Sequence, residues 1–396
     1  MSEKKYGLTV KVAVLSIGVL LYLGNIMGPI LGLIVKEFPD VNPDLVKLIQ
    51  TMPSLSTMVV SLIVGAIGNK VKKRTLVFIA CFCIFFGGIA PVFLYDFNLL
   101  LISRAFFGIG PGIAFPLASG MIGQLFEGAE RQKMMGLRGS VGTATGFILS
   151  LLSGQIAKVN WRYSFFLMSI ALLCFIVQLI WLPEPEVKQP AVSGTKEKIV
   201  LTKWLWLIAL MNIGYNIMLV SYSTNMSIVV IQGNIGDVGQ AGIVSACYTI
   251  GAFLAGMSFA KIEQAIKRYT VALAVGLLGS GLLILLLSTN IFMFFVGAFV
   301  SGTGFGLYNP CVTLKVIGSV ARNATTRAMS IYIVSQSGAA FLSPIIFMFL
   351  KSALGLTGLK ASWMISSPAL LTAALAIVVF VTFTGKPKDA QISAAQ

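Results

Sequence analysis

The sequence contains no histidine and only 13 acidic residues among 396. Without histidine, the chain lacks the commonest protein ligand of metal ions and the usual proton relay near neutral pH. Its five cysteines all lie inside apolar runs, where the loop spacings of a disulfide framework or a zinc site do not occur, so we interpret them as small core residues. We therefore expect no metal and no cofactor, and a protein that is not an enzyme.

Charge of either sign is also scarce, since 11% of the residues are charged and 57% are apolar. A soluble domain of this length would carry about twice that fraction of charge. The apolar residues form runs of roughly 20, the length that a helix needs to cross a bilayer. The runs cover residues 12–35, 46–68, 75–95, 98–121, 134–157, 163–182, 203–231, 239–260, 269–289, 291–315, 328–351 and 361–384.

These runs are predicted to be helices, because in lipid each backbone N–H and C=O must find its partner within the protein. The predicted fold class is an all-α membrane protein with twelve transmembrane helices in two six-helix bundles. A polar stretch rich in proline, lysine and glutamate, residues 183–202, indicates a cytoplasmic linker. It divides the chain into an N-terminal bundle, 1–182, and a C-terminal bundle, 203–396.

The net charge of +16 could indicate a nucleic-acid partner, but the positions of the basic residues argue against one. They gather in alternate loops, such as 70–74, 131–138 and 261–268, and are sparse in the opposite loops. Basic loops stay on the cytoplasmic side of a membrane. The chain is therefore predicted to be a multi-pass protein of the plasma (inner) membrane with both termini cytoplasmic, whose partners are the lipid bilayer and a small-molecule substrate.

One glycine pattern occurs twice, at an offset of 194 residues. A phosphate-binding loop would need a strand before these glycines, and here they lie inside an apolar run. Small residues on one face let two helices approach closely in lipid, so close packing is the predicted role, with bending for gating as a second role. Parallel repeats of six helices with a central binding site describe a known transporter architecture. The paired positions are Gly108 and Gly302, Gly110 and Gly304, Gly112 and Gly306, and Pro116 and Pro310.

Three motifs resemble those of the major facilitator superfamily. They are GAIGNKVKKR at 65–74, RAFFGIGPG at 104–112 and NWRYSFF at 160–166. The resemblance covers the whole chain together with the central linker. It implies two bundles that rock about a central site, and a protein that works as a monomer.

The sequence departs from the family pattern in two places. In the first, Gly65, Lys70 and Arg74 match, but Asn69 stands where the family usually has Asp, so the usual ion-paired latch would lack its charge. In the fifth helix, the antiporter signature of glycine followed by proline is only partial, since Thr143 follows Gly142. A similarity to the drug and organic-solute antiporters is therefore favoured without a full match.

A charged side chain at membrane depth is costly and marks a candidate functional site. Arg104 lies about six residues into its run, roughly 9 Å deep at 1.5 Å per residue. The resemblance implies that it faces the bundle interior, where it would attract an anionic substrate or take part in proton coupling. The alternative is an arginine that braces the N-terminal bundle through backbone carbonyls.

No aspartate or glutamate falls in the middle of a run. A proton-coupled transporter usually needs a buried carboxyl group with a raised pKa. Glu37 is the nearest candidate, and a solvated loop acid is the alternative.

Polar residues inside three of the runs are the candidates for substrate binding. In the seventh run they share about 120° of one helical face. The resemblance implies that these helices line the central cavity, and interhelical hydrogen bonding is the alternative role for each residue. The candidates are Asn25, Asn212, Tyr215, Asn216, Tyr222, Tyr332 and Gln336, with Tyr308 and Asn309 before Pro310.

The favoured function is a secondary transporter that moves a small organic solute by alternating access, coupled to an ion. The alternative is an organic-anion exchanger or a facilitator without proton coupling. The chain shows no catalytic constellation and no sizeable soluble domain, which an enzyme or a receptor would need.

Overall fold

The computed structural model describes residues 6–67, 71–184, 202–320 and 325–383. Within these ranges all regular elements are helices. The first half of the chain contains α1 (Leu8–Leu20), η1 (Leu23–Ile26), α2 (Met27–Glu37), α3 (Pro43–Val46), α4 (Leu48–Ile67), α5 (Lys73–Ile89), η2 (Ala90–Val92), α6 (Phe97–Leu125), α7 (Gly128–Ile156), η3 (Trp161–Ser169) and α8 (Ile170–Trp181). The second half contains α9 (Lys203–Gln232), α10 (Val238–Ile266), η4 (Lys267–Tyr269), α11 (Thr270–Leu287), α12 (Ile291–Gly318), α13 (Thr325–Ala353) and α14 (Ala361–Phe383).

Each predicted apolar run is helical, which confirms the all-α class. By length and apolar composition, nine helical stretches in the described ranges could cross a membrane, or ten if α1 and α2, which meet at a 43° bend, form one span. The stretch Val238–Leu287 contains both α10 and α11. Helix α7 is not among the nine, and its first half carries several charges. Length and apolar composition therefore identify nine or ten candidate spans in the described ranges, fewer than the twelve predicted from the sequence.

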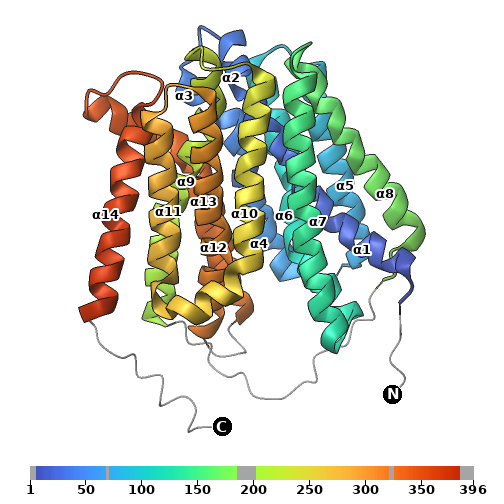
Figure 1. The fold of residues 1–396 in the computed structure, drawn as a ribbon. Helices are drawn as coiled ribbons and strands as arrows, with labels where there is room; N and C mark the ends of the chain where they lie inside the picture. The colour runs from blue at the N-terminus through green and yellow to red at the C-terminus, as the bar shows by residue number, and fades with distance from the viewer. Residues whose placement is uncertain (1–5, 68–70, 185–201, 321–324, 384–396) are drawn as a thin grey trace.

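Both ends of the described chain lie at the same end of the bundle. Helix α1 begins and α14 ends there, whereas α2 and α3 lie at the opposite end (Figure 1). We call the first the terminal end and the second the α3 end. Residues 185–201 of the predicted linker lie outside the described residues.

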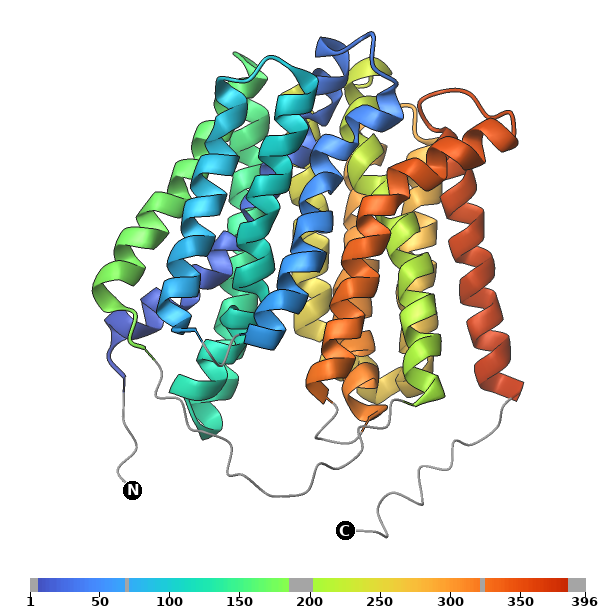
Figure 2. The same cartoon turned by 180° about the vertical axis from the view of Figure 1, so that it is seen from behind.

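The apolar cores largely follow the two halves of the sequence. One cluster of buried side chains, which includes Leu278 and Leu307, draws only on the second half. Two others belong to the first half, although one also takes in Ile228, Ile231 and Val238. Between the halves, α2 packs on α9, α7 on α10 and α4 on α13 (Figures 1 and 2).

The glycines of α6 pack against its two neighbours. A Cβ atom on Gly108 would overlap the backbone of Pro53 in α4, and one on Gly112 would lie 2.9 Å from Val60 Cβ in the same helix. A Cβ on Gly110 would instead meet α5, 2.7 Å from the carbonyl oxygen of Ala80. The predicted close packing of this face is confirmed.

Helix α12 repeats this arrangement. A Cβ on Gly302 would overlap the carbonyl oxygen of Tyr248 in α10, and Gly306 lies against Ala252 of the same helix. Gly304 faces α11, where a Cβ would lie 2.6 Å from the backbone nitrogen of Leu278. The alternation between two neighbours is the same as in α6, so the repeat in sequence is also a repeat in packing.

The repeat extends to the first turn of both helices. The Asp96 side chain caps α6 by accepting from Leu99 N at 2.9 Å, and Asn290 caps α12 by accepting from Met293 N at 3.0 Å. These side chains satisfy backbone N–H groups that have no partner within the helix. Asp96 and Asn290 are again 194 positions apart.

Candidate functional site

The break between α1 and α2 places Asn25 on a short 3-10 turn. Pro29 causes the break, because proline has no N–H for the carbonyl four residues earlier and its ring clashes with that turn. Ser153 of α7 donates a hydrogen bond to the carbonyl oxygen of Ile26 at 2.7 Å. This bond ties α7 to the backbone at the break.

Two glycines of α7 seat the side chains of this break. A Cβ on Gly142 would overlap the Tyr22 ring, and one on Gly146 would overlap the amide of Asn25. These glycines belong to the partial antiporter signature. Their role in this structure is to let α7 approach the broken helix closely.

Arg104 is completely buried in the first half of the chain. Its Nη2 donates to the carbonyl oxygen of Gly87, and to that of Gly88 at 3.3 Å. The guanidinium carbon lies 5.1 Å from the ring centre of Phe107 and 4.9 Å from that of Phe165. Gly87 and Gly88 belong to the last turn of α5, where a cation is favoured by the helix dipole. No described residue of the second half is among these contacts, so the geometry supports the bracing role.

Replacing Arg104 with lysine is expected to lower stability more than ligand affinity. A lysine keeps the charge, but it loses the planar group that reaches two carbonyls while lying between two rings. Hydrogen bonds from a charged group contribute about 1.5–3 kcal/mol, so the melting temperature of the purified protein should fall by several degrees. Arg268→Lys, at an exposed position, serves as the control. A tenfold loss of affinity with unchanged melting would instead place Arg104 in the binding site.

Helix α9 carries two buried asparagines that are bonded to their surroundings. Asn212 Nδ2 donates to Ser335 Oγ of α13 at 2.7 Å. Asn216 Nδ2 donates to the backbone oxygen and to Oδ1 of Asn212, at 2.8 and 2.9 Å. The Asn212 bond joins α9 to α13, as the interhelical alternative expects, whereas the Asn216 bonds stay within α9; together they fix the orientation of both amides.

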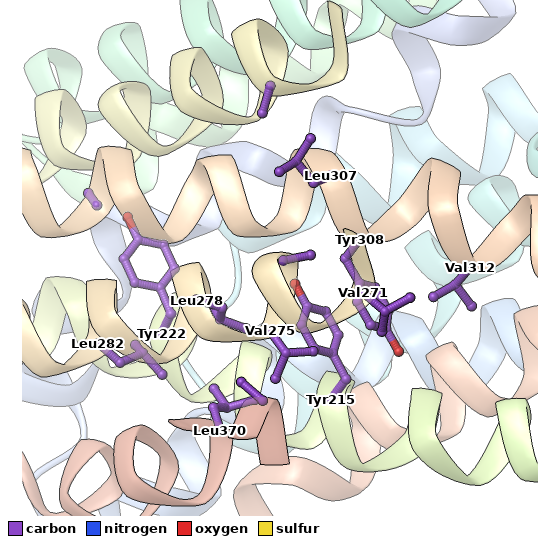
Figure 3. Packing of buried hydrophobic residues seen from close by; sticks show 14 of the residues in the cluster. Tyr215, Tyr222, Val271, Val275, Leu278, Leu282, Leu307, Tyr308, Val312 and Leu370 are labelled. Carbon is purple, nitrogen blue, oxygen red and sulfur yellow. The ribbon is translucent and has the colours of Figure 1, made fainter. Parts of the chain in front are cut away.

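Three tyrosines beside them have unused hydroxyl groups. The rings of Tyr215 and Tyr308 stack with 3.5 Å between their centres and 8° between their planes (Figure 3). The ring of Tyr222 stacks on that of Tyr248 with 4.7 Å between their centres. The hydroxyls of Tyr215, Tyr222 and Tyr308 are buried and have no hydrogen-bond partner in the described part of the chain. A buried hydroxyl without a partner is costly, so these groups are suited to a ligand or to water.

The structure brings most of the predicted residues of the second half together. Tyr332 donates from its hydroxyl to Asn309 Oδ1 at 3.1 Å and precedes Ser335, the partner of Asn212. Gln336 is half-buried on the next turn of α13. Asn25 and Arg104 lie in the first half with different neighbours. The candidates of the second half therefore form a cluster between α9, α12 and α13. Asn25 and Arg104 each lie apart from it.

Sequence reasoning missed a buried charge cluster at the α3 end. Asp44 Oδ1 accepts from Lys47 Nζ at 2.6 Å, and Asp44 Oδ2 accepts from Lys351 Nζ at 2.5 Å. Lys47 also donates to Asn225 Oδ1 at 2.7 Å. Asp44 and Lys47 are only 7% and 4% exposed. We call these four residues the Asp44 cluster.

The pKa values of this cluster are set by burial and by its charges. Burial raises the pKa of Asp44, but the charges and hydrogen bonds of Lys47 and Lys351 outweigh it, so the pKa lies below its usual value. Burial lowers the pKa of Lys47 to about 8, and the charge of Asp44 only partly opposes this. Lys47 precedes the span Leu48–Gly65 and so lies outside it.

Several bonds between the two halves lie toward the α3 end. Ser227 of α9 donates to the carbonyl oxygen of Pro29 and accepts from Gly32 N at 3.2 Å. The Asp44 cluster adds two links, and Lys158 pairs with Asp237 at 3.2 Å. Beside the cluster, a cavity of about 560 Å³ is lined by residues of both halves.

The first family motif is only partly described. Asn69 and Lys70 lie outside the described residues, and a Cβ on Gly65 would meet open space. The Glu184 carboxylate accepts from the backbone nitrogens of Lys73 and Arg74 at 2.8 and 2.9 Å, so it caps α5. Arg74 donates to the carbonyl oxygen of Leu179 and so ties α5 to α8.

Arg138, which the sequence analysis places with the basic residues of a cytoplasmic loop, lies within a helix. It lies in α7, ten residues after the first residue, Gly128. Its Nη1 donates to Ser119 Oγ of α6, and its side chain crosses α1 at Gly18, where a Cβ would lie 3.0 Å from Arg138 Cγ.

Comparison with known proteins gives one consistent family. The sequence model of the Major Facilitator Superfamily matches residues 13–227 and 211–396. The quinolone resistance protein NorA of Staphylococcus aureus is 26% identical over 192 residues, which cover 47% of this chain and 48% of NorA. The alignment thus spans about half the length of this curated relative.

Solved structures share the fold over nearly the whole chain. The xylose transporter XylE from E. coli, in an inward open conformation, matches with a TM-score of 0.73 and 15% identity, covering 96% of each chain. The nucleoside transporter NupG matches with a TM-score of 0.75 and 11% identity, covering 94% of this chain and 99% of NupG. At these identities the likeness concerns the fold.

Proposed function

The chain belongs to the major facilitator superfamily of membrane transporters, and on that premise we propose that it is a secondary transporter of a small organic solute. We further propose that it works by alternating access, is coupled to an ion and acts as a monomer in the plasma membrane. The same proposal includes both termini on the cytoplasmic side, twelve spans and two bundles joined by the 183–202 linker. Counting α10 and α11 separately and including α7 gives that number of spans.

The observation that carries the proposal is the position of the bonds between the halves. Ser227, the Asp44 cluster and the Lys158–Asp237 pair make such bonds toward the α3 end, where α2, α3 and α9 meet. With the termini in the cytoplasm, this end faces outward, and the contacts would close the route to the outside. Alternating access requires such contacts to break when the outward route opens.

The solute site is proposed at the tyrosine cluster of the second half, facing the break at Asn25. The unpartnered hydroxyls of Tyr215, Tyr222 and Tyr308 can bond to polar groups of a solute, and their rings offer stacking surfaces. The names of the similar proteins refer to quinolones, xylose and nucleosides, and all three are small organic compounds. A solute of that size class fits this proposal.

The coupling mechanism is proposed not to depend on Glu37. Its carboxylate lies 3.3 Å from Arg162 Nη2, and the side chain is 44% exposed. Arg162 in turn lies over the rings of Tyr95 and Trp161. Glu37 is thus ion-paired near the surface, unlike the buried carboxyl group that a proton-coupled transporter usually needs.

Transport by the reconstituted protein tests the function. A thermal-shift screen against organic anions, cations and sugars selects the solute, and its flux into proteoliposomes is then measured with and without a pH gradient. We expect flux that depends on the protein, and Glu37→Gln should retain at least half of any gradient dependence. Protein-free liposomes are the control. Loss of the dependence in Glu37→Gln would make Glu37 the coupling group, and absence of flux for every stabilising solute would refute the proposal.

The second candidate function is an organic-anion exchanger or facilitator. It is favoured by the lack of an acidic side chain in the middle of any described helix, because such a transporter needs no buried proton carrier. Flux that is independent of the pH gradient but increases when solute is present on the opposite side of the membrane would identify an exchanger.

A further inference from the structure

Arg138 lies on a defined face of the first half. Ser16 Oγ of α1 accepts from Gln178 Nε2 of α8 at 2.8 Å, so this face of α1 is turned toward α8. Gly18 follows two residues later, which is about 200° around a helix of 3.6 residues per turn. The Arg138 side chain crosses α1 at Gly18 and therefore lies on the face of α1 that is turned away from α8.

The depth of Arg138 distinguishes it from the loop charges. It lies five residues beyond Lys133, or ~7.5 Å further along α7. One turn further along the same helix, Gly142 seats the ring of Tyr22, and Gly146 seats Asn25 after another turn. Arg138, Tyr22 and Asn25 therefore follow one another along a single seam between α7 and the broken helix.

The charge of Arg138 is not neutralised within the described residues. Its one hydrogen bond there goes to Ser119, and no described carboxylate lies within ion-pair distance. A guanidinium has five N–H donors, so most of its bonding capacity is unused. Glu130, in the first turn of α7, is paired with Lys11 at 2.6 Å.

Arg104 is the opposite case. Two carbonyls and two aromatic rings surround it, and it is fully buried, whereas Arg138 is half-buried. A ligand would have to displace part of the core to reach Arg104. Arg138 can be reached without such a change.

We propose that Arg138 binds the anionic group of a solute on the face of α1 that is turned away from α8. This inference rests on the proposed transport function and names the solute class as small organic anions. The planar guanidinium donates two parallel N–H bonds to a carboxylate, while Ser119 holds its Nη1 and fixes its orientation. Arg138 is the binding group and Ser119 is a positioning residue.

Binding of matched probes to the purified full-length protein tests this inference. The anions are nalidixate, benzoate and citrate, and the neutral control is the ethyl ester of nalidixic acid. We expect at least one anion to raise the melting temperature of the wild type. Arg138→Gln should weaken binding of that anion at least tenfold, and Arg138→Lys should weaken it less.

Matched variants separate binding from folding. Ser119→Ala keeps the charge of Arg138 and should weaken anion binding two- to fivefold, and Arg104→Lys should leave the affinity of the folded fraction within twofold of wild type. Affinity for the ester should stay within twofold in every variant. If Arg138→Gln does not elute as a monodisperse protein, Arg138→Lys and Ser119→Ala carry the test.

Two results would overturn the inference. One is a wild type that none of the three anions stabilises, and the other is unchanged anion affinity in Arg138→Gln or, where that variant does not fold, in both Arg138→Lys and Ser119→Ala. Flux measurements distinguish this failure from failure of the proposed function. A protein that transports the neutral ester but binds no anion remains a transporter without this site, whereas a protein that transports no solute is not one.

Discussion

Replacing Asp44 with asparagine is expected to separate the two halves of the protein at the α3 end. In the wild type, the Asp44 carboxylate is the common partner of Lys47 and Lys351. The asparagine would leave two buried ammonium groups without a counter-charge. Removing one partner from a buried ion pair costs about 3–5 kcal/mol. The Asp44–Lys351 pair joins the two halves and exists only while this end is closed, so the cost of leaving Lys351 unpaired falls on the closed state and shifts the equilibrium 100-fold or more toward opening.

Distances between spin labels measure this opening. Val159 and Leu354 are exposed at the α3 end, one in each half, and are replaced by labelled cysteine in a background without the five native cysteines. Asp44→Asn should increase the population with long distances. Asp237→Asn is the matched control, because the Lys158–Asp237 pair also joins the halves but is about half exposed, and such pairs contribute ~0–1 kcal/mol. Identical distance distributions in wild type and Asp44→Asn would show that charge does not hold this end closed.

The equilibrium between the closed and open states is expected to depend on pH because of Lys47. Its pKa is about 8 in the closed cluster, whereas a lysine in water has a pKa of about 10.4. Between these values the closed state binds fewer protons than the open state, so rising pH favours closure. Below pH 8 the lysine is protonated in both states and contributes no slope. In protein that keeps Asp44, the population with short distances between the two spin labels should therefore increase between pH 8 and pH 10.

Replacing Gly302 with alanine is expected to cause the largest loss of stability among single-atom changes. The added Cβ would overlap the backbone carbonyl of Tyr248, which cannot rotate away as a side chain could. Overpacking a tight core costs about 1–3 kcal/mol and sometimes more. Helices α10 and α12 would have to separate along their whole contact, so the yield of folded protein and its melting temperature should both fall.

Gly214→Ala is the control for this variant. Gly214 lies in α9, where an added Cβ would have no atom within 4 Å. Alanine in a helix is more stable than glycine by about 0.5–1 kcal/mol, so this variant should melt at or above the wild-type temperature. Equal melting of Gly302→Ala and wild type would mean that the contact between α10 and α12 relaxes freely, against the packing described here.

The helices were predictable because lipid leaves the backbone few alternatives. An apolar run of about 20 residues must pair its own N–H and C=O groups, so its composition alone indicates a helix. The contacts of Gly108 and Gly302 were predictable for a different reason, since the repeat at a fixed offset marks equivalent faces of two helices. The break after α1 was not predicted, although Gly24 and Pro29 stand beside it as its signals.

The charge cluster could not be read from the sequence. Asp44 and Lys351 are 307 positions apart, and no local pattern indicates that a lysine beside a loop is buried. Arg138 was misassigned because it follows Lys133 closely and looks like one of the cytoplasmic charges. Periodicity reports which face of a helix is apolar, but it does not report how far a helix extends beyond the apolar run, and α7 begins six residues before the predicted start.

The break between α1 and α2 makes the two repeats mechanically unequal. The offset that relates α6 to α12 also aligns α1 and α2 together with α9, which is a continuous helix of 30 residues. Around residues 21–26 the backbone hydrogen bonds of the first repeat join residues three apart, as in a 3-10 helix. The side chains of Tyr22 and Asn25 pack there against glycines of α7. A change in the angle between α1 and α2 would break few backbone hydrogen bonds, whereas bending α9 would interrupt its continuous series of backbone hydrogen bonds. The two repeats thus differ at equivalent positions, because the first has a break between α1 and α2 where the second has the continuous helix α9.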